Sequence, residues 1–184
     1  MTFTEELLVA SLPVLILTGT ASVFDWRFRK IPNKLVLTGL FAALALPFAS
    51  EYALSIQSVL LGGLIGLVLY LPLYAIRWVG AGDAKLMAVV GMFVGPGGAA
   101  LIALYSFMAG GLLGVALLAA YGGWRPTWER LSLLFRSLVL RLRGVPIPMP
   151  VGSQEQTLRL PYAIAIFVGT VVWLSKNLPT SVSS

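Results

Sequence analysis

Two aspartates are the residues of this sequence best suited to carry chemistry. The chain contains no cysteine and no histidine, which excludes thiol nucleophiles, imidazole acid–base catalysis and thiolate metal sites. Its only aspartates are Asp25 and Asp83, and each borders an apolar stretch. Two carboxyl groups that face each other can share a proton, so that the ionised group activates water while the protonated group polarises a carbonyl. The sequence therefore predicts catalysis by a carboxylate pair, with no metal and no cofactor.

Each aspartate also has a purely structural interpretation. Asp25 follows the first apolar segment, and the basic residues of positions 27–30 could neutralise its charge. Asp83 could cap the start of a helix, a role worth about 1 kcal/mol. However, the apolar stretch after Asp83 has only about nine residues, or ~13 Å of helix, whereas the hydrocarbon core of a bilayer is ~30 Å thick. Asp83 is therefore drawn towards the apolar region, where a carboxylate is costly and indicates function.

The elements that position these aspartates are apolar segments. The chain of 184 residues is 58% hydrophobic and only 11% charged, whereas the charged share of a soluble domain is about 25%. A turn signal, Gly95-Pro96-Gly97-Gly98, interrupts the longest apolar stretch. We predict an all-α membrane protein, a single domain over residues 1–184, built as a six-transmembrane-helix bundle with a short fourth helix. The six segments lie at about residues 7–24, 35–49, 59–76, 86–94, 99–121 and 160–174.

Basic residues give the predicted orientation, because cytoplasmic loops collect Lys and Arg. With six spans and the N-terminus outside, twelve of the thirteen basic residues lie inside and only Lys176 lies outside. A five-span alternative without the turn at Gly95 would split the charge almost evenly. The six-span topology places Asp25 and Asp83 together on the cytoplasmic side. The net charge of +6 then serves topology, with anionic lipid headgroups rather than nucleic acid as its partner.

The predicted cytoplasmic loop of about residues 122–159 has a pattern of its own. From Thr127 to Arg143, apolar residues recur at helical spacing and charged residues fall largely on the opposite side. This pattern is typical of a basic amphipathic helix that lies in the headgroup plane. We expect it to anchor the loop to the membrane before the last span.

The sequences around both aspartates resemble those of the type IV prepilin peptidases, a branch of the GxGD aspartic membrane peptidases. The segment from Asp25 to Ile31-Pro32-Asn33 is similar to the family's Asp, short basic stretch and Ile-Pro-Asn. The segment Gly80-Ala81-Gly82-Asp83-Ala84-Lys85-Leu86 is similar to its Gly-x-Gly-Asp-x-Lys-Leu. Leu160-Pro161-Tyr162-Ala163 resembles its Pro-Tyr element. The two aspartate motifs together are far more specific than a lone Gly-x-Gly-Asp.

The resemblance implies an aspartic endopeptidase in which Asp25 and Asp83 are catalytic. Such enzymes cleave the leader peptide of a prepilin on the cytoplasmic side of the bacterial inner membrane. The short form is similar to the CpaA/TadV-like peptidases of tight-adherence (Flp) pili. The larger bifunctional members carry a four-cysteine zinc site and also methylate the new N-terminus. Because this chain has no cysteine, the resemblance does not extend to methyl transfer.

The other motif residues have candidate roles in positioning. Gly80 and Gly82 would permit either a positive φ or a close approach of the substrate. Pro32 and Asn33 would begin the second span. Lys85 would either extend its amine towards the headgroups or lower the pKa of one aspartate.

Two functions of other classes remain open from the sequence. A small proton-coupled carrier would use the two aspartates as a relay, although the internal repeat typical of carriers is not evident. A non-enzymatic pilus-assembly membrane protein would leave Asp83 and its flanking glycines unexplained. The predicted partners are a prepilin substrate and membrane lipids, and the sequence predicts no oligomeric state.

Overall fold

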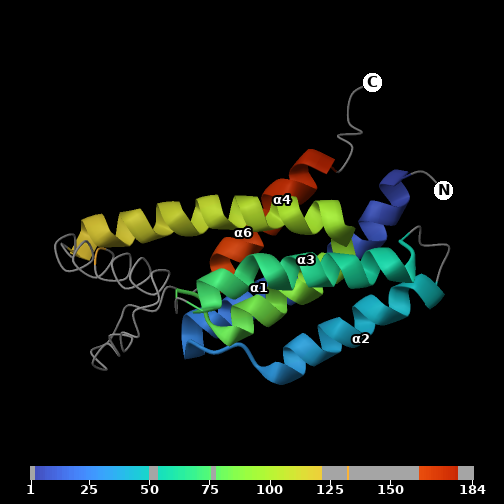
Figure 1. The fold of residues 1–184 in the computed structure, drawn as a ribbon, viewed down its shortest axis with the longest axis horizontal. Helices are drawn as coiled ribbons and strands as arrows, with labels where there is room; N and C mark the ends of the chain where they lie inside the picture. The colour runs from blue at the N-terminus through green and yellow to red at the C-terminus, as the bar shows by residue number, and fades with distance from the viewer. Residues whose placement is uncertain (1–2, 50–53, 76–77, 122–131, 133–161, 178–184) are drawn as a thin grey trace, which may run out of the picture. The chain divides into compact units, whose positions relative to one another are not determined.

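The computed structural model describes residues 3–49, 54–75, 78–121, 132 and 162–177. These residues are helical almost throughout (Figure 1), which confirms the predicted all-α class for the described part of the chain. The chain divides into two compact units, residues 1–111 with 160–184 and residues 112–159, and the first unit contains both aspartates. The helices are α1 (Phe3–Phe28), α2 (Asn33–Ala49), α3 (Ile56–Ala75), α4 (Ala81–Tyr121) and α6 (Tyr162–Asn177).

Helix α1 continues beyond the predicted end of the first span. It runs through Asp25 to Phe28, and the chain leaves it at Arg29, whose φ is 54°. The Arg29 N–H donates to the Asp25 carbonyl oxygen at 2.9 Å, so Arg29 is the left-handed residue that commonly ends a helix. Asp25 therefore lies in the last turn of α1. The sequence-based placement of Asp25 after the helix is wrong, because the helix stops only where the backbone turns left-handed.

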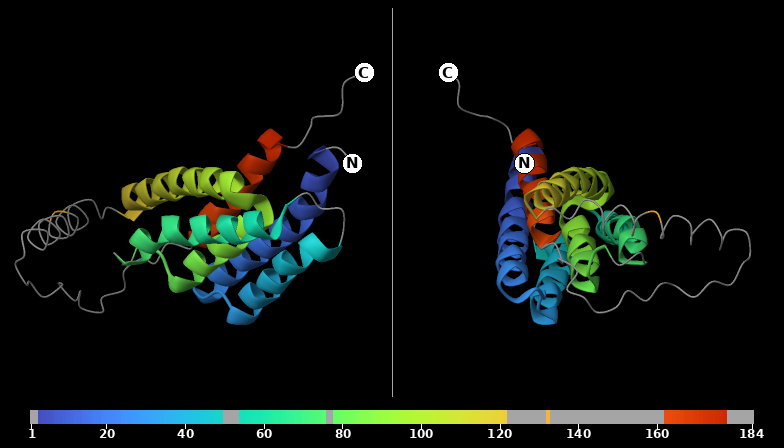
Figure 2. Two further views of the ribbon diagram at one scale, coloured as in Figure 1. Left: turned by 45° about the vertical axis from the view of Figure 1, so that its right-hand side comes forward. Right: turned by 90° about the vertical axis from the view of Figure 1, so that its left-hand side faces the viewer.

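Helix α4 is broken at Gly95. Its φ of 73° and ψ of 179° lie outside the helical region, and Pro96 follows. A positive φ of this size suits glycine, which has no Cβ to clash with the backbone. Figures 1 and 2 show the chain folding back at this point, so that the residues before and after Gly95 run in different directions. The predicted turn is confirmed.

Two segments are long and apolar enough to cross a membrane, Ile56–Ala75 and Ala81–Ala116, the second of which contains the break at Gly95. Two shorter apolar helices, Asn33–Phe48 and Tyr162–Asn177, accompany them. The six-span count stays a prediction. The predicted amphipathic helix from Thr127 to Arg143, like nearly all of the predicted loop, lies outside the described residues.

Glycines bring α3 against the first part of α4. A Cβ at Gly62 would overlap the carbonyl oxygen of Gly91, and a Cβ at Gly66 would overlap that of Met87. Residue numbers rise along α3 while they fall along α4, so the two helices are antiparallel. We call these two contacts the glycine seam. Glycines four residues apart thus let the two helix backbones pack closely.

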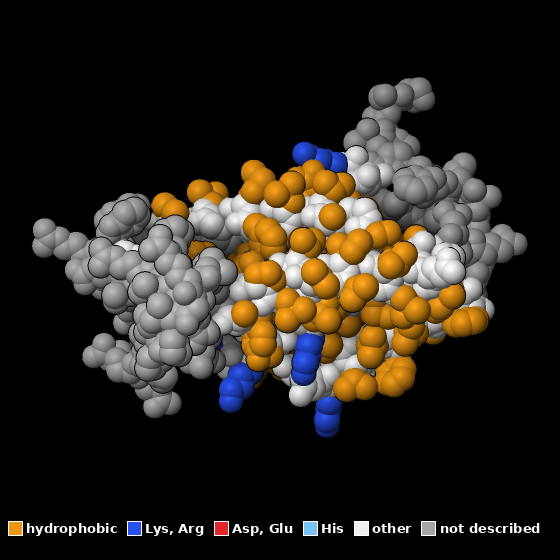
Figure 3. All heavy atoms as spheres, in the orientation of Figure 1, with side chains coloured by type: hydrophobic (Ala, Val, Ile, Leu, Met, Phe, Trp, Pro, Cys, Tyr) orange, Lys and Arg blue, Asp and Glu red, His pale blue; other side chains and the backbone are white. Residues whose placement is uncertain are grey.

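The remaining helices of the first unit pack around this pair. Helices α1 and α6 lie together, with the Ser22 hydroxyl donating to the Ala163 carbonyl at 2.9 Å. Gly39 of α2 contacts Leu17 of α1 and Val89 of α4. The interior is apolar, whereas large apolar side chains also cover much of the outer surface (Figure 3). Such a surface is expected of helices that face lipid tails.

Candidate active site

The two sequence motifs meet at one end of the first unit. The side chain of Ile31 packs over Gly82, where a Cβ would lie 3.2 Å from the Ile31 Cβ. Lys85 Nζ donates to Asn33 Oδ1 at 3.5 Å on the surface beside this contact. The loop between α1 and α2 is thus docked on the first turn of α4. This docking brings the end of α1, which carries Asp25, to the start of α4, which carries Asp83.

Asp83 is held by the backbone at the start of α4. Its side chain is 7% exposed, and Oδ2 accepts a hydrogen bond from the Gly80 N–H at 3.1 Å. In return, the Asp83 N–H donates to the Gly80 carbonyl oxygen at 3.2 Å. The carboxylate thus forms the N3-to-N-cap half of a capping box with Gly80 at the N-cap, so Asp83 is not itself the N-cap residue. The other carboxylate oxygen, Oδ1, is buried and has no hydrogen-bond partner among the described residues.

Asp25 is held by the start of α6. Its side chain is also 7% exposed, and Oδ2 accepts a hydrogen bond from the Ala163 N–H at 3.3 Å. Ala163 is in the first turn of α6, where the positive end of the helix dipole stabilises a negative charge. Burial works against a charge on Asp25, whereas the Ala163 N–H and the charge of Arg29 work in its favour. Asp25 thus lies where an anion has specific support.

The two carboxyl groups are close enough for the charge on one to act on the other. Two interacting negative charges in a buried site repel, an arrangement in which a carboxyl pair can share one proton. The structure therefore brings together, from α1 and α4, the two aspartates that the sequence selected.

A comparison with known protein families identifies the family of the chain. Residues 12–115 match the type IV leader peptidase family. The matched range contains both aspartates and covers more than half of the chain. The chain belongs to this family. No curated protein and no solved structure gave a match. The predicted membership of a prepilin peptidase family is confirmed, and the family is one of peptidases. The two helices that are long and apolar enough to cross a membrane accord with a membrane peptidase.

The glycines of the leader peptidase motif act through close contact. Among the described residues, the glycine with a positive φ is Gly95, and neither Gly80 nor Gly82 shares this conformation. A Cβ at Gly80 would lie 3.2 Å from Asp83 Oδ2, and a Cβ at Gly82 would meet Ile31. The positive-φ interpretation of these two glycines is therefore wrong. They allow the carboxylate and the α1–α2 loop to approach the start of α4.

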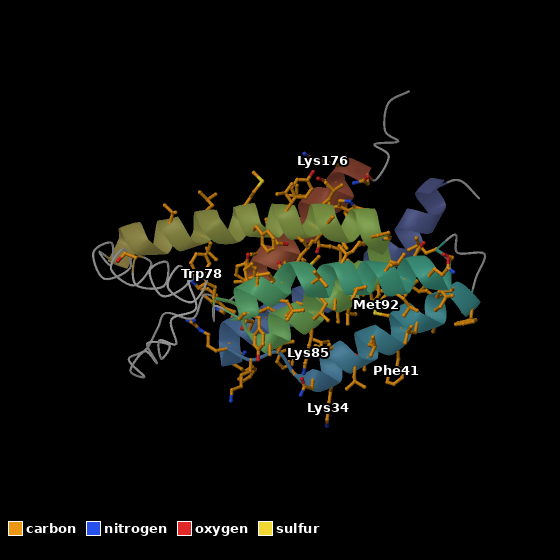
Figure 4. All side chains as sticks on the ribbon, viewed as in Figure 1. Lys34, Phe41, Trp78, Lys85, Met92 and Lys176 are labelled. Carbon is orange, nitrogen blue, oxygen red and sulfur yellow. The ribbon has the colours of Figure 1, made fainter. Side chains whose placement is uncertain are left out.

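Pro32, Asn33 and Lys85 lie at the edge of the candidate site. The Pro32 carbonyl accepts a hydrogen bond from the Leu35 N–H at 3.0 Å, and α2 begins at Asn33, as predicted. Lys85 is exposed and reaches Asn33. Its charge is not among those that act on either aspartate, so its predicted effect on an aspartate pKa is not supported. The amine lies at the surface, as expected for a lysine at a helix end (Figure 4).

Two tyrosines beside the aspartates received no role from the sequence. Tyr70 of α3 is fully buried, and its ring meets that of Tyr162 of α6 edge-on, with centroids 5.8 Å apart. The Tyr162 hydroxyl donates to the Ser106 carbonyl oxygen at 3.4 Å. Both tyrosines interact electrostatically with Asp83. For Tyr70, the signal in the sequence was a phenol within an otherwise apolar span, which is weak without knowledge of what lies opposite. Tyr162 belongs to the segment that resembles the family's Pro-Tyr element.

Proposed function

We propose that this peptidase removes the leader peptide from type IV prepilins of the Flp type, with Asp25 and Asp83 as its catalytic pair. The proposal is carried by the burial of two interacting carboxyl groups in a chain of the type IV leader peptidase family. Membership of a peptidase family favours this function over a proton-coupled carrier or a non-enzymatic anchor. The Flp-type substrate rests on the resemblance of the motifs alone.

The hydrogen bonds around the pair suggest a division of roles. Asp25, supported as an anion by the Ala163 N–H and Arg29, takes a proton from water as the water oxygen bonds to the scissile carbonyl carbon. Asp83, with Oδ1 unpaired, carries the shared proton and donates it to the carbonyl oxygen. When the tetrahedral intermediate collapses, the C–N bond breaks, the leaving amine takes the proton held by Asp25, and a hydroxyl of the intermediate returns its proton to Asp83 as the carbonyl re-forms. This is general acid–base catalysis that requires no metal.

The charge distribution supports a site at the cytoplasmic face of the bacterial inner membrane. Figure 4 shows Lys34 and Lys85 along one side of the molecule and Lys176 at the opposite side. By the positive-inside tendency, the end that carries the aspartates would face the cytoplasm, in a multi-pass protein. The basic residues that flank this end in the described part of the chain are Arg27, Arg29, Lys30, Lys34 and Lys85.

The test is cleavage of a purified Flp-type prepilin by the full-length protein reconstituted in lipid. We expect Asp25→Asn and Asp83→Asn each to lower the cleavage rate by about 10²–10⁴-fold, the usual contribution of a general acid or base. Glu51→Gln, at an acidic residue outside both motifs, serves as the matched control and should cleave normally. Near-normal cleavage by either aspartate variant would exclude the two-carboxylate mechanism. Proton flux without cleavage would instead support the carrier.

A further inference from the structure

The glycine seam sets the register between α3 and the start of α4. It pairs Gly62 with Gly91 and Gly66 with Met87. From the first pair to the second, each helix advances by four residues, or about one turn, in opposite directions along the sequence. One further turn along both helices brings Tyr70 opposite Asp83. The electrostatic interaction between these two side chains agrees with this register. A phenol of α3 is therefore placed against the carboxylate that the proposed reaction uses.

The Tyr70 hydroxyl is buried without a hydrogen bond of standard geometry to any described residue. Its ring packs against Phe107, with centroids 5.2 Å apart, and against Tyr162. The hydroxyl lies near those of Ser106 and Tyr162 but forms no hydrogen bond of standard geometry within the described part of the chain. A buried hydroxyl left unpaired costs about 1–3 kcal/mol, so its retention in an apolar helix requires an explanation.

The other hydroxyl groups nearby already donate their protons elsewhere. Tyr162 donates to the Ser106 carbonyl, and the Ser106 hydroxyl donates to the Ile102 carbonyl at 2.7 Å. Asp83 Oδ1, across the register from Tyr70, is the second buried polar atom that has no partner in the described residues. Two unpaired polar groups thus lie on facing turns of α3 and α4, one a donor and the other the oxygen that would carry the shared proton.

We propose that Tyr70 is a further catalytic residue, whose hydroxyl donates a hydrogen bond to the scissile carbonyl oxygen of the substrate. This inference rests on the proposed peptidase function. As the water oxygen bonds to the carbonyl carbon, the carbonyl π electrons move to the oxygen, and Tyr70 stabilises the negative charge that develops there while Asp83 transfers its proton to that oxygen. The proton of the water goes to Asp25, and Tyr70 keeps its own proton throughout. Donors aimed at a developing oxyanion in a dry site supply large rate effects.

The test compares Tyr70→Phe with Tyr162→Phe in the reconstituted full-length protein, using the same prepilin. Tyr70→Phe should lower kcat by about 10²–10³-fold with little change in KM, as for loss of an oxyanion donor. Tyr162→Phe, a matched loss of a phenol that already bonds to Ser106, should lower kcat only a few-fold. Unchanged kcat in Tyr70→Phe, or a change confined to KM, would overturn the inference.

A second substitution separates the hydroxyl from packing in case Tyr70→Phe fails to fold. 3,5-Difluorotyrosine at position 70 keeps the ring and the hydroxyl but makes the phenol more acidic. The groups facing it (Asp83, Tyr162 and, across the pair, Asp25) are unaltered, so any change in the pH profile belongs to position 70. We expect kcat to fall at an alkaline pH at which the unsubstituted protein is still fully active. A pH profile that superimposes on that of the unsubstituted protein would overturn the proposal.

The outcomes also separate this inference from the proposed function. If the unsubstituted protein cleaves no prepilin, the proposed function fails. If it cleaves, both aspartate variants are inactive and Tyr70→Phe has normal kcat, only the role of Tyr70 fails.

Discussion

At the scale of the residue, both carboxyl groups are positioned by backbone N–H groups. Gly80 donates to Asp83 and Ala163 donates to Asp25, and in each case the N–H belongs to the first turn or the cap of a helix. Backbone donors at helix starts are rigid and carry only partial positive charge. They therefore hold a carboxylate in place without neutralising it as a lysine in direct contact would. The amine of Lys85, the basic residue of the second motif, donates to Asn33 Oδ1.

The hydrogen bond from the Gly80 N–H makes the position of the Asp83 carboxylate depend on the lack of a side chain at Gly80. A methyl group from Gly80→Ala would lie 3.2 Å from Oδ2 and push the carboxylate away. We expect a loss of kcat of up to about tenfold, because the carboxylate must move by a few tenths of an ångström and a displacement of about 1 Å at a reacting group can cost about 10²-fold. Gly111→Ala, where a Cβ would meet nothing within 4 Å, is the control and should be fully active. Equal prepilin cleavage rates for the two variants would contradict this view of the cap.

At the scale of the element, breaks in helices create the site as much as the helices do. Helix α1 ends at a left-handed arginine, and α4 changes direction at Gly95. The first break lets Ile31 reach Gly82, and the second returns the chain so that Phe107 packs on Tyr70. Without these breaks, the described helices would pass the two aspartates without enclosing them.

The stability of the protein should fall when any side chain is added at Gly95. Gly95→Ala forces a Cβ onto a residue with φ of 73° and ψ of 179°, a conformation open almost only to glycine, at a cost of about 1–3 kcal/mol. Gly97→Ala lies two residues on, meets nothing within 4 Å, and should leave stability unchanged. Thermal unfolding in the same detergent measures both variants. A Gly95→Ala variant as stable as Gly97→Ala would show that the turn tolerates other conformations.

At the scale of the whole molecule, apolar surface and segregated charge both indicate a lipid setting. Large apolar residues such as Leu12, Ile16 and Leu64 are more than half exposed. Basic residues gather near the aspartates, whereas Lys176 is in the last turn of α6. This distribution supports the proposed topology, in which the chemistry is at the cytoplasmic face.

Single-cysteine labelling tests this orientation, and the absence of native cysteine gives a clean background. A membrane-impermeant maleimide added to intact spheroplasts should label a Lys176→Cys variant but not a Lys34→Cys variant. Permeabilisation should expose the Lys34→Cys site as well. Labelling of the Lys34→Cys variant alone in intact cells would invert the topology and place the aspartates on the outer side.

The sequence by itself determined the helical class and the break at Gly95, and it selected the two candidate carboxylates. Each is encoded locally: in the length of the apolar runs, in the absence of Cys and His, and in a Gly-Pro-Gly-Gly turn that no helix can absorb without distortion. The two sequence motifs that contain Asp25 and Asp83 also identified the family. These features require no knowledge of what lies opposite each segment.

Only the tertiary structure decided how the site is assembled. The Ala163 N–H meets Asp25 across 138 positions of sequence, and Tyr70 faces Asp83 only because the glycine seam fixes the register of two antiparallel helices. The extension of α1 through Asp25 and the contact role of Gly80 and Gly82 likewise differ from the sequence-based view. Periodicity and composition report which face of a segment is apolar, but they do not report its partner or its register. Those depend on steric fit between backbones, which exists only in the folded chain.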